Sequence, residues 1–139
     1  MHGNCVNPLT GIRAMLTDTD ILIDYLRGEP EAVAFVESNV NRICLSAITV
    51  AELNQGVKGA RERDCVDALV SGFTILPITE EIAREAGLLC RQYRKSHGSG
   101  LADCLVAATS LLQGLPLKSL NLKHFPMVED AEAPFRKDG

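Results

Sequence analysis

Short apolar segments alternate with helical ones along most of this chain, and this alternation restricts the possible folds more than any other feature. Four apolar stretches have strand length: AMLT at 14–17, ICLS at 43–46, TILPI at 74–78 and LKSL at 117–120. Segments with helical spacing separate them. Strands that alternate with helices form a parallel sheet covered on both faces. The sequence therefore predicts an α/β three-layer sandwich of four to five short strands, with MVED at 127–130 as the fifth candidate.

Capping residues mark where the helices begin. Asp18-Thr19-Asp20 can cap a helix over 21–26, and Pro30 suits the first turn of the next one. Ser46 and Thr79 stand before the apolar-periodic segments 47–59 and 79–96. The remaining helices are expected over 60–73 and 101–114, where Gly72 and Gly114 supply stop signals.

Three parts follow from this periodicity. Residues 1–14 have no apolar pattern and are expected to be a flexible extension, which makes Met15 a candidate for the natural start beside Met1. Residues 15–130 form the folded domain, and 131–139 are expected to be a polar tail.

Charge and cysteine content narrow the class of protein. The net charge of −4 argues against nucleic-acid binding by bulk positive charge, although a local site remains open. The five cysteines are scattered without a C-x-x-C pair, which favours reduced thiols in the cytoplasm over a disulfide framework or a zinc site. No apolar run approaches the roughly 20 residues of a membrane span.

Polar residues gather where the predicted strands end. Asp18 and Asp20 follow the first strand, Asn121 follows the fourth, and Glu52 and Asp103 lie early in helices that follow a strand or loop. In parallel α/β sheets, the crevice beyond the carboxyl ends of the strands is where ligands bind. Each acid also has a plain structural interpretation: Asp18 or Asp20 as a helix cap, Asp103 as an acid favouring a helix N-terminus, and Glu52 as a surface residue.

Taken together, the acids point to a cation. Several carboxylates in one crevice repel each other unless a positive ion lies among them, and hard oxygen ligands suit Mg²⁺ or Mn²⁺. Such an ion, with open positions for water, supports phosphodiester hydrolysis.

Four segments carry a family resemblance: MLTDTDILIDYL at 15–26, ITVAELNQG at 48–56, GLADCLVAAT at 100–109 and SLNLKHF at 119–125. With these segments in this order, the chain resembles the PIN-domain ribonucleases, and specifically the VapC-like toxins of toxin–antitoxin pairs. The resemblance covers Met15 to about Val128.

The resemblance implies roles for individual residues. Asp18, Glu52 and Asp103 would form the acidic metal-binding core, and Asn121 stands where the family has an acid or asparagine. Thr19, Asp20 and Ser119 would support this core. Ser119 replaces the family's usual threonine and keeps the hydroxyl, whereas Asp20 replaces a commoner asparagine, which leaves open whether it binds a metal directly. The RNA-binding residues are unknown.

The resemblance also implies an activity and partners. The chain would be a Mg²⁺-dependent endoribonuclease, with Mn²⁺ as a substitute, acting on RNA such as transfer RNA. A VapB-like antitoxin would neutralise it by placing a cation in the acidic crevice, and two copies would pair as a homodimer.

Two other classes of function remain open. A haloacid-dehalogenase-like phosphatase would use Asp18 as nucleophile and Asp20 as acid, but the later acidic motif of that class is missing. A non-enzymatic protein, either a receiver-like domain or an inert PIN-fold binding module, is the second alternative. A receiver needs an aspartate after the third strand, where this chain has Pro77.

Overall fold

The computed structural model describes residues 13–136 and contains one parallel sheet of four strands in the order β3-β2-β1-β4. The strands are β1 (Met15–Thr17), β2 (Ile43–Ser46), β3 (Thr74–Leu76) and β4 (Leu117–Lys118). The helices are α1 (Thr19–Leu26), α2 (Pro30–Ser38), α3 (Ala47–Gln55), α4 (Ala60–Ser71), α5 (Glu80–His97), α6 (Leu101–Gln113) and the 3₁₀ helix η1 (Leu122–His124).

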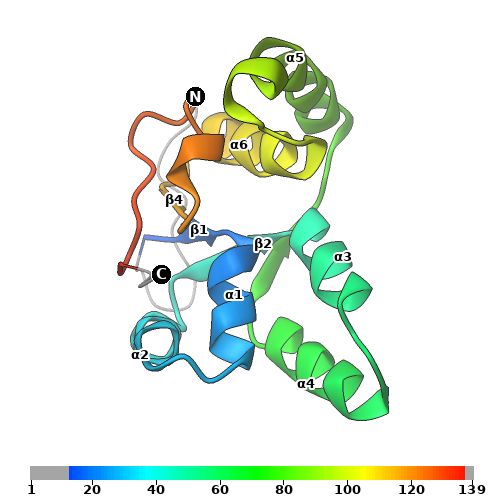
Figure 1. Ribbon diagram of the computed structural model, residues 1–139, viewed down its shortest axis with the longest axis vertical. Helices are drawn as coiled ribbons and strands as arrows, with labels where there is room; N and C mark the ends of the chain where they lie inside the picture. Colours follow the sequence, from blue (N-terminus) through cyan, green and yellow to red (C-terminus); the bar gives the residue numbers. More distant parts are fainter. Residues whose placement is uncertain (1–12, 137–139) are drawn as a thin grey trace.

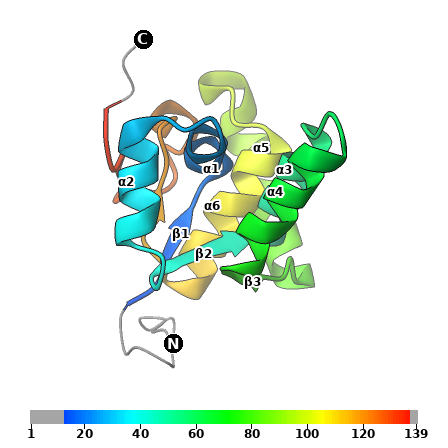
Figure 2. The same ribbon diagram turned by 90° about the horizontal axis from the view of Figure 1, so that it is seen from below.

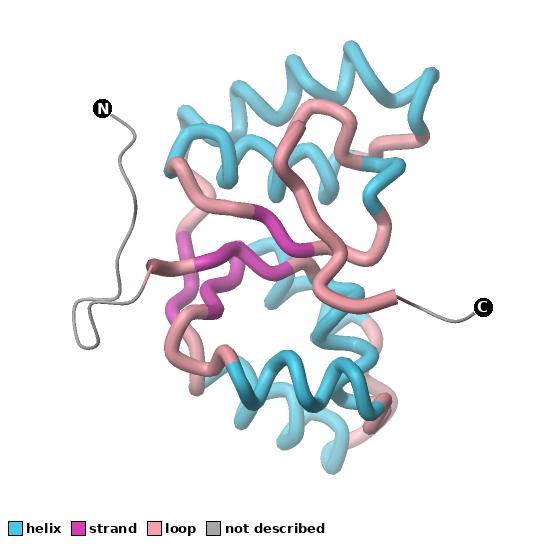
Figure 3. Tube along the Cα trace, turned by 90° about the vertical axis from the view of Figure 1, so that its left-hand side faces the viewer, coloured by secondary structure: helices cyan, strands magenta, loops and turns pink. Residues whose placement is uncertain are grey.

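Helices cover both faces of the sheet, as the alternation predicted (Figures 1 and 3). Alternate strand residues face opposite sides, so Leu16 and Cys44 pack with α5 and α6, while Met15, Ile43 and Leu45 pack with the helices of the other layer. Figure 2 shows α2 and α4 on either side of α1 in that second layer. The predicted three-layer sandwich is confirmed.

The predicted caps lie at the helix starts. Ser46 and Thr79 accept hydrogen bonds from the backbone N–H groups of Ile48 and Ile82, and Pro30 occupies the first turn of α2. Asp18 is the N-cap of α1, so its interpretation as a cap is correct, although this does not exclude a second role.

The candidate fifth strand at 127–130 does not form. Residues 127–130 form turns, and the chain reaches the sheet edge only at Glu132, whose N–H donates to the Leu117 carbonyl and whose carbonyl accepts from the Ser119 N–H. A single parallel bridge joins Lys118 to Glu132. The apolar MVED pattern instead reflects packing, because Val128 is buried in the core beside α6.

The proposed boundaries are only partly visible. The extension at 1–14 lies outside the described residues except for its last two positions, and 137–139 of the tail lie outside them as well. Within residues 13–136, no helix is both long and apolar enough to cross a bilayer.

Candidate active site

The carboxyl ends of β1 and β4 bring together residues about a hundred positions apart in the sequence. The Asp18 N–H donates to the Lys118 carbonyl, which places Ser119 beside Asp18. The Ser119 hydroxyl donates to Asp18 Oδ2 at 2.8 Å, and Asp18 Oδ1 accepts from the Thr19 N–H at 2.9 Å. Both oxygens of this buried carboxylate are therefore held in place.

Asp20, two residues after Asp18, also links the start of α1 to the loop after β4. Its Oδ2 accepts from the Leu120 N–H at 3.0 Å and lies 3.4 Å from the Ser119 hydroxyl. The Asn121 N–H in turn donates to the Ser119 oxygen at 3.0 Å. Asp20 thus braces the loop after β4, which is a positioning task independent of any metal.

Glu52 is linked to the start of α1 through Thr19. The buried Thr19 hydroxyl donates to Glu52 Oε1 at 2.7 Å and lies 3.0 Å from the hydroxyl of Thr49 on α3. Glu52 itself is only half-buried, so it stands at the edge of its helix and not in the core. Its carboxylate nevertheless has a defined position beside the residue that follows Asp18.

Asp103 stands at the first turn of α6, where it accepts from the Gly100 N–H through Oδ2 at 3.1 Å. Its interpretation as an acid favouring a helix N-terminus is therefore also correct. The same Oδ2 lies 3.4 Å from Nδ1 of His124, and that nitrogen lies 2.7 Å from Nδ2 of Asn121. Asp103 and Asn121 thus meet at one imidazole ring.

Burial and neighbouring negative charge both act on Asp18. Together they raise its pKa from 3.8 to about 7: burial contributes most, followed by Asp20 and, more weakly, Asp103, while the hydrogen bonds from Ser119 and Thr19 oppose the shift. Within residues 13–136, no lysine or arginine forms an ion pair with Asp18, Glu52 or Asp103. The crevice is therefore an environment that a cation would stabilise.

The donor set fits a hard divalent cation, though not as a complete cage. In the described part of the chain, no three His, Cys, Asp or Glu side chains are arranged as ligands of one ion. Mg²⁺ does not require such a cage, because it is commonly bound by one or two carboxylates while water and substrate phosphates supply the other ligands. Asp18 and Asp103, whose charges repel across the crevice, are the pair that fits this arrangement.

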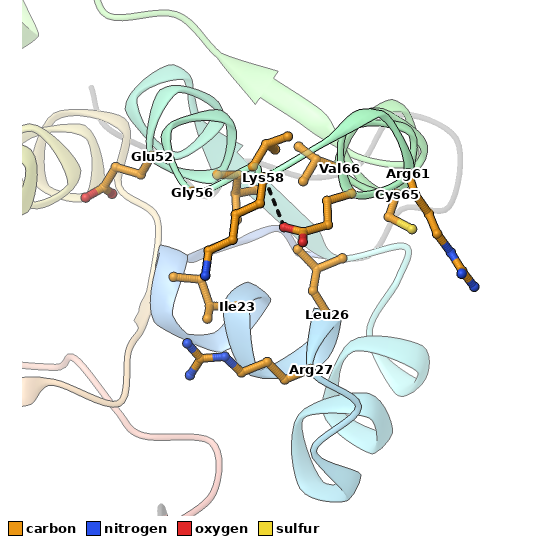
Figure 4. A pocket seen from close by; sticks show the side chains of 12 residues that line it. Ile23, Leu26, Arg27, Glu52, Gly56, Lys58, Arg61, Cys65 and Val66 are labelled. Atoms are coloured by element: carbon orange, nitrogen blue, oxygen red, sulfur yellow. Dashed lines mark hydrogen bonds between the residues drawn. The ribbon is translucent and has the colours of Figure 1, made fainter.

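A pocket of about 530 Å³ lies next to the crevice, between α1, α3 and α4 (Figure 4). Apolar side chains, among them Leu26, Leu53 and Val66, line it together with three basic residues, Arg27, Lys58 and Arg61. Glu52 belongs to the lining, but in Figure 4 its carboxylate points away from the other labelled side chains. Glu52 therefore connects the pocket with the acidic crevice.

Two features were missed or underestimated from the sequence. His124 is not among the site residues predicted from the sequence, but its ring contacts both Asn121 and Asp103. Arg27, Lys58 and Arg61 are not among them either, and all three line the pocket. The H-F pair after Asn121 was the one available signal for His124, and no sequence pattern indicated the pocket.

Comparison with known proteins adds independent findings. Residues 15–124 match the PIN domain family. The chain is 41% identical over 128 residues to Ribonuclease VapC10 of Mycobacterium tuberculosis, covering 90% of this chain and 96% of the relative, and 38% identical over 124 residues to Ribonuclease VapC19 of the same species, covering 86% and 98%. A toxin-antitoxin complex from Klebsiella pneumoniae contains a chain of similar structure, with a TM-score of 0.74 and 28% identity over 89% of this chain and all of that one.

Proposed function

Because this chain belongs to the PIN-domain family and, within it, to the VapC-like ribonuclease toxins, we propose that it is a divalent-metal-dependent endoribonuclease of a toxin–antitoxin pair. The observation that carries the proposal is the gathering of Asp18, Asp20 and Asp103 beyond the carboxyl ends of β1 and β4, where burial, Asp20 and Asp103 together raise the pKa of Asp18. A bound cation would stabilise such a crevice, because it offsets the repulsion between the closely spaced carboxylates.

The proposed mechanism assigns separate tasks to the acids. Asp18 and Asp103 would hold Mg²⁺ or Mn²⁺ through their carboxylate oxygens. When bound, the ion polarises a phosphate oxygen of RNA and makes a water molecule more acidic. Glu52, oriented by the Thr19 hydroxyl, accepts a hydrogen bond from the attacking water. Ser119 fixes the position of the Asp18 carboxylate, and Asp20 fixes the loop that carries Asn121.

The experiment that tests the activity is cleavage of total RNA and of purified transfer RNA by the isolated protein, with products mapped at nucleotide resolution. We expect cleavage with Mg²⁺ or Mn²⁺, none in EDTA, and none by Asp103→Asn. Cleavage that persists in EDTA contradicts the metal mechanism. A wild-type protein inactive with every divalent metal tried supports the alternative of an inert binding module.

The phosphatase alternative has no support beyond the D-x-D pattern. The PIN-domain match covers the whole strand–helix array from Met15 to His124. Asp20, the acid in that alternative, has its Oδ2 bound by the Leu120 N–H.

We also propose that the neutralising partner is a VapB-like antitoxin and that it occupies the pocket. The Klebsiella chain with a similar fold was solved as part of a toxin-antitoxin complex. The apolar lining suits leucine-like side chains of a partner helix, and the basic residues Arg27, Lys58 and Arg61 suit acidic residues beside them. A peptide leaving the pocket past Glu52 would reach the acidic crevice, where a basic side chain would replace the charge of the metal.

Two copies of the chain are proposed to pair through α5 and α6. Leu88 on α5 and Leu101 at the start of α6 are 52% and 59% exposed, and such a pairing would remove them from water. Light scattering on wild type and Leu88→Glu checks this proposal: the wild type should have the mass of a dimer and the variant that of a monomer. A monomeric wild type contradicts it.

A further inference from the structure

The ring of His124 contacts both Asp103, at the start of α6, and Asn121, in the loop after β4. Its Nδ1 is 2.7 Å from Asn121 Nδ2 and 3.4 Å from Asp103 Oδ2. The side chains of His124 and Asp103 are 25% and 26% exposed, so the contact is partly shielded from water. One ring nitrogen therefore faces two of the residues assigned to the site.

Two hydrogen bonds fix the backbone of His124 and so the position from which its ring extends. The His124 carbonyl accepts from the hydroxyl of the fully buried Ser99 at 2.7 Å, and its N–H donates to the Asn121 carbonyl at 3.0 Å. Gly98, in a left-handed conformation with φ +66°, lies beside the ring: a Cβ there would be in ordinary van der Waals contact with Nε2, at 3.6 Å. The loop between α5 and α6 thus packs against the imidazole.

Fixing Asn121 matters because its amide has two unlike ends. The nitrogen and oxygen lie on opposite sides of Cγ, so holding one end at the ring turns the other end away from it. In the observed arrangement the nitrogen is at the ring, and the oxygen, which is the end able to bind a cation or a water, is turned away. Without the ring, the amide loses this contact.

Asp103 is fixed mainly by another contact, since its Oδ2 accepts from the Gly100 N–H at 3.1 Å. The same oxygen lies 3.4 Å from Nδ1 of His124, so the ring limits the space into which the carboxylate can move. Groups that orient a metal ligand without touching the metal commonly change metal affinity or activity by about 10- to 100-fold when removed.

We infer that His124 is a positioning residue that orients the Asn121 amide and the Asp103 carboxylate for the metal and the RNA. The inference rests on the proposed ribonuclease function. It assigns no proton transfer to the ring and no contact between the ring and RNA.

The test compares three variants of the full-length protein. His124→Leu removes the polar nitrogen at similar bulk. His124→Asn returns a polar group to about the position of Nδ1. His97→Leu is the matched control, because the exposed His97 on α5 contacts Ser96 and Tyr93 and none of the crevice residues. For each, kcat and KM for RNA are measured at saturating Mg²⁺, and the Mg²⁺ concentration at the midpoint of thermal stabilisation is measured without RNA.

We expect His124→Leu to lower kcat by about 10- to 100-fold, with KM for RNA within about 2-fold, and to raise the Mg²⁺ midpoint. His124→Asn should recover most of both losses, and His97→Leu should match wild type. Equal losses in His124→Asn and His124→Leu overturn the inference. An unchanged Mg²⁺ midpoint in His124→Leu overturns it as well, since a purely structural residue would lower the melting temperature and leave the midpoint alone.

Two further arms keep the outcome interpretable. If wild type cleaves no RNA, the proposed function fails, while the Mg²⁺ midpoints of wild type and His124→Leu still decide the role of His124. If His124→Leu does not fold, His124→Gln replaces it, because its amide reaches toward the place of Nε2 and not of Nδ1. Full recovery of kcat by His124→Gln then overturns the inference.

Discussion

The acidic crevice and the neighbouring pocket share Glu52 but hold their charged side chains in different ways. In the crevice, Asp18 has both carboxylate oxygens hydrogen-bonded, and Asp20, Glu52 and Asp103 each have at least one bound oxygen. In the pocket, the carboxylate of Glu62 accepts from the Lys58 N–H at 3.2 Å. The basic side chains of Arg27, Lys58 and Arg61 are exposed, and no side-chain hydrogen bond or ion pair is seen for them within residues 13–136.

This difference separates two physical tasks. A fixed set of charges stabilises a reaction because no free energy is spent on reorganising them at the moment of reaction. Long basic side chains that remain free to move can adjust to a partner's surface, at the cost of the side-chain entropy lost on binding. The crevice is built like a reaction centre, and the pocket is built like a docking surface.

The largest expected effect is on catalysis when a crevice acid is neutralised. Asp18→Asn, Glu52→Gln and Asp103→Asn should each reduce cleavage by at least about 10²- to 10³-fold, the loss typical of removing one group that stabilises the transition state. Single-turnover rates on the mapped RNA measure this. Asn121→Ala should lose less, because an amide contributes no formal charge. A greater loss in Asn121→Ala than in Asp103→Asn contradicts the assignment of the site.

The pocket should behave in the opposite way. Leu26→Ala should leave RNA cleavage within about 2-fold of wild type but weaken binding of the antitoxin by roughly 10-fold, as expected for an interface residue worth more than 1 kcal/mol. Titration calorimetry with the cognate antitoxin, obtained by copurification, measures the binding. If Leu26→Ala leaves affinity unchanged and lowers cleavage instead, the two regions do not divide the tasks as proposed.

A smaller effect concerns the stability of the metal-free protein. Asp18→Asn keeps the cap on the Thr19 N–H and removes a repelled charge, so it should be at least as stable as wild type, with a gain of about 1 kcal/mol. Mg²⁺ at about 100 times its dissociation constant should stabilise wild type by roughly 2.7 kcal/mol and the variant by much less. Thermal melting in EDTA and in Mg²⁺ tests both points. Equal shifts would mean that Asp18 acts only as a cap.

The same charge predicts how stability depends on pH. The pKa of Asp18 is about 7 in the folded protein and 3.8 in the unfolded chain, so between these values the folded state binds the proton more tightly. Stability should therefore decrease as pH rises from about 4 to about 7 in EDTA, and this decrease should be smaller in Asp18→Asn. Parallel curves for the two proteins would show that another group causes it.

The smallest expected effect is that of removing the N-terminal segment. A chain starting at Met15 should melt within a few degrees of the full chain and cleave RNA at the same rate, because both compared regions are built from residues after Met15. The loss to be checked is that of the Arg13 carbonyl, which accepts a hydrogen bond from Arg42 Nε at 3.2 Å. An insoluble or inactive truncation would show that the segment belongs to the folded unit.

The parts of the structure that depend on local signals were predictable from the sequence. Strand length, helical periodicity and the caps Ser46 and Thr79 are encoded within a few residues, and the structure follows them. The predicted gathering of acids depended on one topological rule, that parallel strands end at the same edge. The edge contact at Glu132 was not predictable, because it depends on hydrogen bonds to β4 that leave no mark on the side-chain pattern. His124 was underestimated for a similar reason: its partners come from two separate elements.

The two halves of the crevice lie far apart in the sequence, which determines when the crevice can form during synthesis. The hydrogen bond from Ser119 to Asp18 spans 101 residues, and that from Leu120 to Asp20 spans 100. At about 5–20 residues added per second, Ser119 is joined to the growing chain roughly 5–20 s after Asp18. Until then the segment that completes the carboxylate cluster has not been synthesised, so the proposed active site cannot form in a nascent or prematurely terminated chain. The proposed docking surface on α1, α3 and α4 is synthesised first and would be available to an antitoxin before the active site is complete.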